Sequence, residues 1–114
     1  MLETVKKAED IISKALWNAV SDQDYQKELR EYERAKKLLT ELGKVTTGVE
    51  RERNRVLSFC LMRIDNTLVA LGDKKGGVGR MQYALKVAFK SENKVQIARC
   101  LAALGARLAG VGLA

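Results

Sequence analysis

Apolar side chains recur at steps of three and four residues along most of this chain, and this spacing constrains the fold more than any other feature of the sequence. Such steps place apolar side chains on one face of an α-helix, whereas a half-buried strand would need strict alternation. No segment alternates in this way over a useful length. The pattern therefore predicts an all-α protein: a bundle of about five helices, with an antiparallel core of three long helices and two shorter ones.

Five segments carry the helical spacing, and short polar or glycine-containing stretches separate them. The chain has no proline, so the helix ends must depend on Gly, Ser and Thr. Gly43 and Gly72 follow the second and third segments and suit the C-terminal end of a helix. We expect helices over residues 4–20, 25–42, 47–71 and 80–90, and from about residue 92 toward the C-terminus.

Three candidate N-caps support these starts. Ser21 with Asp24, and Thr47 with Glu50, have the spacing of a capping box. Ser91 precedes the fifth segment and suits an N-cap there. We expect the fifth helix to fray through its glycines, and its spacing assigns to the buried face Val95, Ala98, Leu101, Ala102 and Leu104.

The length of 114 residues fits one domain that spans residues 1–114. Hydrophobic residues make up 46% of the chain, and this is too apolar a composition for intrinsic disorder. The most apolar stretch, residues 101–114, is short and contains Arg107, so we expect no membrane span. We also expect no secretory signal peptide, because no basic segment followed by an apolar one opens the chain.

The charge is divided unevenly between two parts of the domain. Residues 1–73, the three-helix part, hold 13 Lys and Arg against 13 Asp and Glu, whereas residues 74–114 hold eight basic residues against Glu92 alone. The whole net charge of +7 therefore belongs to the basic part, which contains a glycine-rich loop and two helices. A field of one sign on a third of a small domain favours an anionic partner such as nucleic acid, an acidic protein or anionic lipid.

The loop and the exposed stripe of the next helix provide the candidate anion-binding residues. We expect the cations of the loop and of this stripe to form one contiguous surface, with Tyr83 as the residue on which a base could stack. The full candidate set is Lys74, Lys75, Arg80, Tyr83, Lys86, Lys90, Lys94 and Arg99.

Several chemistries are disfavoured by what the chain lacks. Histidine is absent, and with it the commonest general base and transition-metal ligand. Cys60 and Cys100 lie 40 positions apart without a CxxC motif, so we expect no metal site and no other cofactor. Both cysteines fall in apolar helical segments, as expected of free thiols in the cytoplasm or another reducing intracellular compartment. We therefore expect a protein that is not an enzyme.

Residues 75–79, KGGVG, resemble the start of the deviant phosphate-binding loop of partition and division-site ATPases. That resemblance would imply ATP binding. The family pattern continues with Lys and then Ser or Thr, whereas this chain continues with Arg80 and Met81, which lacks the hydroxyl that holds magnesium. The preceding segment is also predicted to be a helix, not a strand. We therefore treat the likeness as fortuitous.

A broader resemblance involves helical hairpins. The Leu-Gly pairs at 71–72 and 104–105 lie 33 residues apart, with Ala84 between them, and resemble the tetratricopeptide repeat of 34 residues. The segment 24–39 is similar to the hairpins of tetratricopeptide and microtubule-interacting-and-transport domains. Membership would imply a non-catalytic scaffold that binds a peptide or helix in a groove.

Two functions remain open on this basis. The first is a non-catalytic helical module for protein–protein interaction or assembly, whose partner is another protein or a second copy of the chain. Homo-oligomerisation is expected because residues 101–114 offer an apolar segment of small residues, unless Leu108, Val111 and Leu113 fold back onto the core. The alternative is a DNA- or RNA-binding protein of phage, plasmid, viral or regulatory type that uses the basic C-terminal third.

Overall fold

The computed structural model describes residues 1–113, without the side chains of Asp22 and of residues 111–113. Within this part of the chain every regular element is an α-helix, so the predicted all-α bundle of about five helices is confirmed. The elements are α1 (Leu2–Asp22), α2 (Tyr25–Thr40), α3 (Thr47–Ala70), α4 (Gly77–Ser91) and α5 (Lys94–Leu113).

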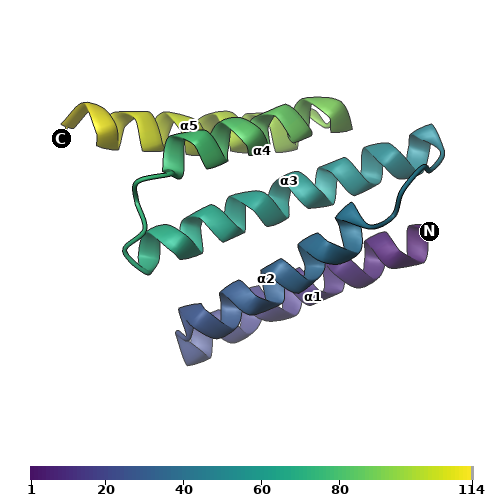
Figure 1. The fold of residues 1–114 in the computed structure, drawn as a ribbon, viewed down its shortest axis with the longest axis horizontal. Helices are drawn as coiled ribbons and strands as arrows, with labels where there is room; N and C mark the ends of the chain where they lie inside the picture. Colours follow the sequence, from purple (N-terminus) through teal and green to yellow (C-terminus); the bar gives the residue numbers. More distant parts are fainter. Residues whose placement is uncertain (114) are drawn as a thin grey trace.

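Helix α3 lies between two helical hairpins. Successive helices run in opposite directions, with the α1–α2 hairpin on one side of α3 and the α4–α5 hairpin on the other (Figure 1). Both hairpins pack on α3, and across the described residues neither packs on the other. In Figure 1, α2 and α4 lie in front of α1 and α5. Because both hairpins contact α3, this helix joins the two halves of the bundle.

The hydrophobic core follows the two sides of α3. From α1 and α2 it receives Ile12, Tyr32 and Leu39, each almost completely buried, and from α4 it receives Met81, which is also fully buried. Helix α3 contributes apolar side chains to both sides, among them Cys60. Helix α3 is also the longest helix among the described residues, at 24 residues.

All three predicted caps differ from those observed. Thr47 is the first residue of α3, and the N-cap of that helix is Thr46, whose side chain forms no capping bond. Ser21 lies in the last turn of α1, and Asp24 itself caps α2, since its Oδ1 accepts a hydrogen bond from the backbone N–H of Lys27 at 3.1 Å. Likewise Ser91 belongs to α4, and the side chain of Asn93 accepts a backbone N–H from the first turn of α5 at 2.9 Å. The connection between α1 and α2 is therefore shorter than the sequence pattern indicated, and α5 begins later than indicated, at Lys94.

Helices α4 and α5 are longer than predicted. Helix α4 begins at Gly77, inside the glycine-rich segment, and α5 continues through Gly105 and Gly110 instead of fraying there. At 20 residues α5 exceeds α2, which has 16. Contacts with α3 and α4 hold α5, and such packing overrides the weak helix propensity of glycine.

The buried face predicted for α5 is wrong at Val95, Ala98, Leu101 and Ala102, which are exposed, whereas Leu104 is partly buried and packs against the core. Val95 and Leu101 are 61% and 50% exposed, whereas Gln96, Cys100 and Arg107 face the protein. The sequence pattern missed this orientation because two of the inward residues are polar and find partners only in the folded structure. The amide nitrogen of Gln96 donates to the sulfur of Cys100 at 3.6 Å, and Arg107 reaches α3.

A buried carboxylate links α3, α4 and α5. Asp65 of α3 is fully buried, and its two oxygens accept hydrogen bonds from the Nε atoms of Arg80 and Arg107 at 2.8 and 2.7 Å. Arg107 also donates to Oδ1 of Asn66 at 2.7 Å. A Cβ atom at Gly77 would lie 3.1 Å from the side chain of Arg107, so glycine lets the first turn of α4 approach this cluster. We call these residues the Asp65 cluster.

A second buried polar cluster joins α2 to α3. The hydroxyl of Tyr32 donates to the carboxylate of Glu28, which also accepts from Arg63 at 3.3 Å. Burial and the neighbouring Glu28 carboxylate raise the pKa of the Tyr32 hydroxyl above its ordinary value. Hydrogen-bonded polar groups thus lie on both sides of α3.

We expect Asp65→Asn to lower the free energy of unfolding by about 3–5 kcal/mol, because it removes the buried charge that pairs with both Arg80 and Arg107 and leaves Arg80 only its longer pair with Asp73. Urea denaturation followed by circular dichroism measures this change. The matched control is Asp73→Asn, which removes a 3.6 Å pair with Arg80 at a half-exposed carboxylate and should cost less than about 1 kcal/mol. Equal losses in the two variants would contradict the role of the buried carboxylate.

The thiol of Cys60 gives a pH prediction. Burial raises the pKa of the Cys60 thiol from 9.0 to about 12. Between these values the unfolded chain binds fewer protons than the folded protein, so the free energy of unfolding falls as pH rises, by up to roughly 1.4 kcal/mol per pH unit. Urea denaturation at neutral pH and at about pH 10.5 should show a smaller fall for Cys60→Ala than for the parent. The same fall in both would contradict this origin.

Candidate functional site

The structure divides the eight predicted anion-binding residues among four places. Two lie in the loop between α3 and α4, one belongs to the Asp65 cluster, three share one flank of α4, and two lie on α5. In that order they are Lys74 and Lys75; Arg80; Tyr83, Lys86 and Lys90; and Lys94 and Arg99.

The three residues on α4 line a groove between the two hairpins. Together with Arg53, Asn54 and Thr40 they surround an open hollow of about 290 Å³. Leu39, Leu57 and Val87 form its buried floor. We call this the α2–α4 groove. Its lining residues come from α2, α3 and α4, whose arrangement Figure 1 shows.

The α2–α4 groove is basic and contains no carboxylate among its lining residues. Lys86 and Lys90 are exposed and, in the described part of the chain, form no ion pair. Arg53 is held at the edge of the groove, since it donates to the carbonyl oxygen of Gly43 at 3.1 Å and lies 3.8 Å from Glu50. The local charge therefore remains positive.

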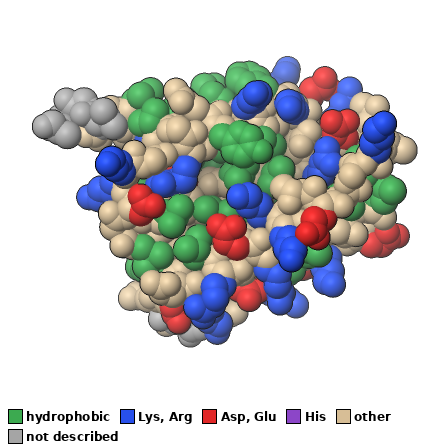
Figure 2. Space-filling model, viewed as in Figure 1, with side chains coloured by type: hydrophobic (Ala, Val, Ile, Leu, Met, Phe, Trp, Pro, Cys, Tyr) green, Lys and Arg blue, Asp and Glu red, His purple; other side chains and the backbone are tan. Residues whose placement is uncertain are grey.

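This basic character is local. Figure 2 shows the same face of the molecule with Lys and Arg side chains interspersed among Asp and Glu and among apolar atoms. The C-terminal third thus does not form a continuous surface of one sign on this face. A ligand attracted to it would meet separate groups of cations.

The loop cations line a different hollow. Lys74 and Lys75 border an open space of about 680 Å³, together with Asp73 and Arg107. Asp73 offsets one of these charges, and Arg107 is already bonded to Asp65. This hollow is larger than the α2–α4 groove but provides fewer available cations for an anion.

Arg80 departs from its predicted role as an exposed cation. Its side chain is 24% exposed and bonds to Asp65, to the carboxylate of Asp73 and to the backbone carbonyl of Asp73 at 2.8 Å. The expected contiguous surface from the loop to the stripe of α4 is therefore interrupted at this residue. No local pattern in the sequence indicates this bond, because Asp65 lies 15 residues before Arg80 on another helix.

The cations on α5 lie outside both hollows. Neither Lys94 nor Arg99 lines either of them. The guanidinium of Arg99 instead lies 6.0 Å from the ring centre of Phe59 on α3, within the range of a cation–π contact. Arg99 therefore contributes to the packing of α5 on α3.

Sequence reasoning missed Arg53 and Asn54. Both belong to the charge-neutral part of the chain, where counting charges by segment hides a local excess. Asn54 is 6% exposed and points into a helix face that looked apolar in the sequence. Only the packing of α4 beside α3 brings these two residues next to Lys86 and Lys90.

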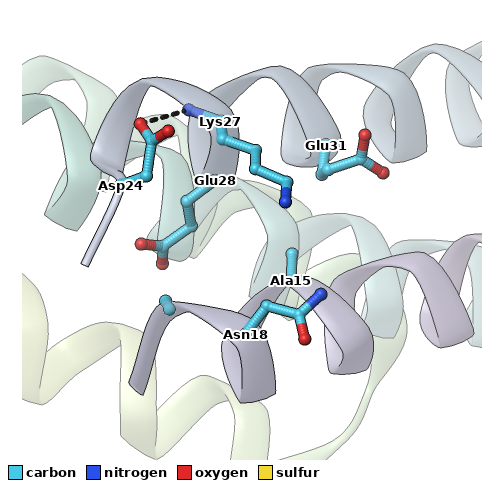
Figure 3. A pocket seen from close by; sticks show the side chains of 7 residues that line it. Ala15, Asn18, Asp24, Lys27, Glu28 and Glu31 are labelled. Carbon is cyan, nitrogen blue, oxygen red and sulfur yellow. Dashed lines mark hydrogen bonds between the residues drawn. The ribbon is translucent and has the colours of Figure 1, made fainter. Parts of the chain in front are cut away.

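A third, much smaller hollow lies between α1 and α2 (Figure 3). Asp24, Glu28 and Glu31 surround it with Lys27 and Asn18, and the backbone of Lys27 donates to Asp24. Its volume of about 20 Å³ accommodates one water molecule at most. We assign it no ligand.

The described residues contain no group of three or more His, Cys, Asp or Glu side chains arranged to hold a metal ion. No helix among them has both the length and the apolarity needed to cross a bilayer.

Comparisons with known protein families, curated proteins and solved structures find no match to this chain. The likeness to tetratricopeptide and microtubule-interacting-and-transport hairpins thus stays a prediction.

The placement of Arg80 yields a stability prediction. We expect Arg80→Ala to lower the free energy of unfolding by about 1–3 kcal/mol, since it removes a charged hydrogen-bond partner from the buried Asp65. The matched control, Lys74→Ala with Lys75→Ala, changes two exposed loop residues and should shift it by no more than about 0.5 kcal/mol each. Thermal or urea denaturation distinguishes the two, and an unaffected Arg80→Ala variant would contradict the assignment.

Proposed function

We propose that this protein is a non-catalytic helical assembly module that pairs with a second copy of itself through the outward side of α5. The observation that carries the proposal is the apolar surface of that helix. Val95, Leu101 and Leu108 are 61%, 50% and 51% exposed. Apolar surface gathered on one helix face favours association with another surface of the same kind.

Small residues fill the space between these side chains. Ala98, Ala102, Gly105 and Ala109 are all exposed and follow one another at steps of four, three and four residues. This is the spacing of a helix–helix seam, and small side chains allow two helix backbones to approach closely. We call these seven residues the outer face of α5.

The orientation of α5 in the bundle supports this interpretation. Its outward side carries the exposed apolar and small residues named above, whereas Gln96, Cys100 and Arg107 face inward beside the partly buried Ile97, Ala103 and Leu104. The two polar inward residues bond within the protein, as described above. An apolar outward side on such a helix is consistent with a partner that covers it.

Charge favours an antiparallel pair of α5 helices. Lys94 begins α5, and its first turn contains no acidic residue. In an antiparallel pair Lys94 would lie beside the C-terminal end of the partner helix, whose carbonyl groups carry partial negative charge. In a parallel pair the two Lys94 side chains would face and repel each other. A two-fold antiparallel arrangement therefore fits this helix better.

The amino-acid composition and the burial of the thiols support a non-catalytic role. Histidine is absent from the sequence, and both cysteines are buried as free thiols. Burial raises the pKa of both thiols, which disfavours the reactive thiolate. These features agree with a protein that acts through its surfaces.

We expect a reversible dimer, because one helix face is small compared with the roughly 1,600 Å² of a standard interface. Multi-angle light scattering from about 10 µM to about 1 mM should show that the average molar mass rises with protein concentration. The Ala102→Glu variant should stay monomeric, because it places a charge in the proposed contact between the two α5 helices. Val20→Asp is the matched control, since Val20 is 80% exposed on α1 and should leave association unchanged. A strictly monomeric parent would contradict the proposal.

Cysteine cross-linking tests the orientation. For an antiparallel pair centred on α5, Ala98→Cys and Ala109→Cys proteins should form disulfide dimers when mixed and few when oxidised separately. The native Cys60 and Cys100 are fully buried and contribute little background. Efficient cross-linking of Ala98→Cys with itself would instead indicate a parallel pair.

A further inference from the structure

We propose that the α2–α4 groove is a binding site for a nucleotide unit, with the phosphate held by Lys86, Lys90 and Arg53 and the base stacked on Tyr83. The unit is either a free nucleotide or one residue of a single-stranded nucleic acid. None of the groove residues belongs to α5. The inference is therefore independent of the pairing proposed above.

The cations converge from two helices onto one space. Lys86 and Lys90 are one turn apart on α4, so their side chains extend from the same flank of the helix. Arg53 approaches from α3, and its bond to the carbonyl of Gly43 fixes the guanidinium at the groove without neutralising it. A phosphate attracts such a set because several cations reach it at once.

The balance of charge in the groove stays positive after its neighbours are counted. Glu50 is the carboxylate that pairs with Arg53, at a long 3.8 Å, and it is half exposed. Lys86 and Lys90 have no carboxylate within ion-pairing distance among the described residues. The groove therefore offers at least two cations whose charge no protein group offsets.

The other parts of the groove suit a base. Tyr83 lies one turn before Lys86 on the same flank of α4 and is 53% exposed, so its ring is available for stacking. Leu57 and Val87 give the groove an apolar floor, and the amide of the nearly buried Asn54 supplies a donor and an acceptor beside it. The volume of about 290 Å³ is close to the lower end of the usual range for small-ligand sites.

The hollow beside the loop between α3 and α4 is larger, but it is weaker in available cations and in aromatic side chains. Beside Lys74 and Lys75 it contains the carboxylate of Asp73 and the already bonded Arg107, and no aromatic side chain lines it. The α2–α4 groove combines available cations, an exposed ring and an apolar floor. It therefore has the chemistry needed to hold both the phosphate and the base of a nucleotide.

Three probes test the proposal with the full-length protein: AMP, inorganic phosphate and a single-stranded oligothymidylate of about 12 nucleotides. Binding is measured by calorimetry for the small probes and by fluorescence anisotropy for the labelled strand, at low and moderate salt. We expect AMP or the strand to bind more tightly than inorganic phosphate. A preference for AMP identifies a free nucleotide, and a preference for the strand identifies nucleic acid.

Substitutions distinguish binding in the α2–α4 groove from non-specific electrostatic attraction to the protein surface. Lys86→Ala with Lys90→Ala should weaken binding about tenfold or more, and should lower the slope of strand affinity against salt by roughly one to two units. The matched control is Lys6→Ala with Lys7→Ala, the same charge change at two exposed lysines of α1, and should leave affinity nearly unchanged. Tyr83→Ala should weaken binding of AMP or of the strand about tenfold, and Tyr83→Phe should preserve it.

Three results would overturn the proposal. The first is that neither AMP nor the strand binds at low salt. The second is that the two double-lysine variants weaken binding equally, and the third is that Tyr83→Ala leaves the binding affinity unchanged. Thermal denaturation of each variant establishes that it is folded. Lys86, Lys90 and Tyr83 are exposed and form no ion pair, so these substitutions leave the core unchanged.

Discussion

The carboxylate of Asp65 is the point at which three helices of this protein converge. It is fully buried on α3, and it holds Arg80 of α4 and Arg107 of α5 through one oxygen each. A buried charge of this kind is stable only when it is fully paired, so it fixes the relative position of the helices that supply its partners. Gly77 contributes by leaving room for the side chain of Arg107. The Asp65 cluster thus joins the α4–α5 hairpin to α3 with defined geometry.

Both proposed surfaces depend on that geometry. Because Arg107 faces inward to reach Asp65, α5 is rotated so that Leu101 and Leu108 are left outside. Because Arg80 holds the first turns of α4 against α3, Tyr83 and Lys86 come to lie beside Arg53 in the α2–α4 groove. The Asp65 cluster therefore accounts both for the apolar outer face of α5 and for the basic groove beside α4. The two proposed surfaces share no residue, since none of the residues that line the groove belongs to α5.

The central place of α3 explains the distribution of polar groups in the core. Each hairpin packs on α3 and not on the other hairpin, so two separate interfaces must be specified along one helix. Asp65 specifies one of them, and the bonds of Glu28 with Tyr32 and Arg63 specify the other. Hydrogen-bonded buried groups penalise shifts of register that apolar contacts alone would tolerate. This arrangement makes α3 the common reference for both halves of the bundle.

By itself the sequence determined the fold class and the number of helices, because apolar residues such as Ile12, Leu39 and Met81 recur with the period of a helix. Only the tertiary structure decided which way α5 faces and which cations remain available. Those outcomes depend on Asp65 meeting Arg107 from 42 positions away, and on Arg53 lying next to Lys86 across a helix interface. Helical periodicity reports local burial within one segment, whereas a buried ion pair or a groove between hairpins exists only once distant segments have packed together.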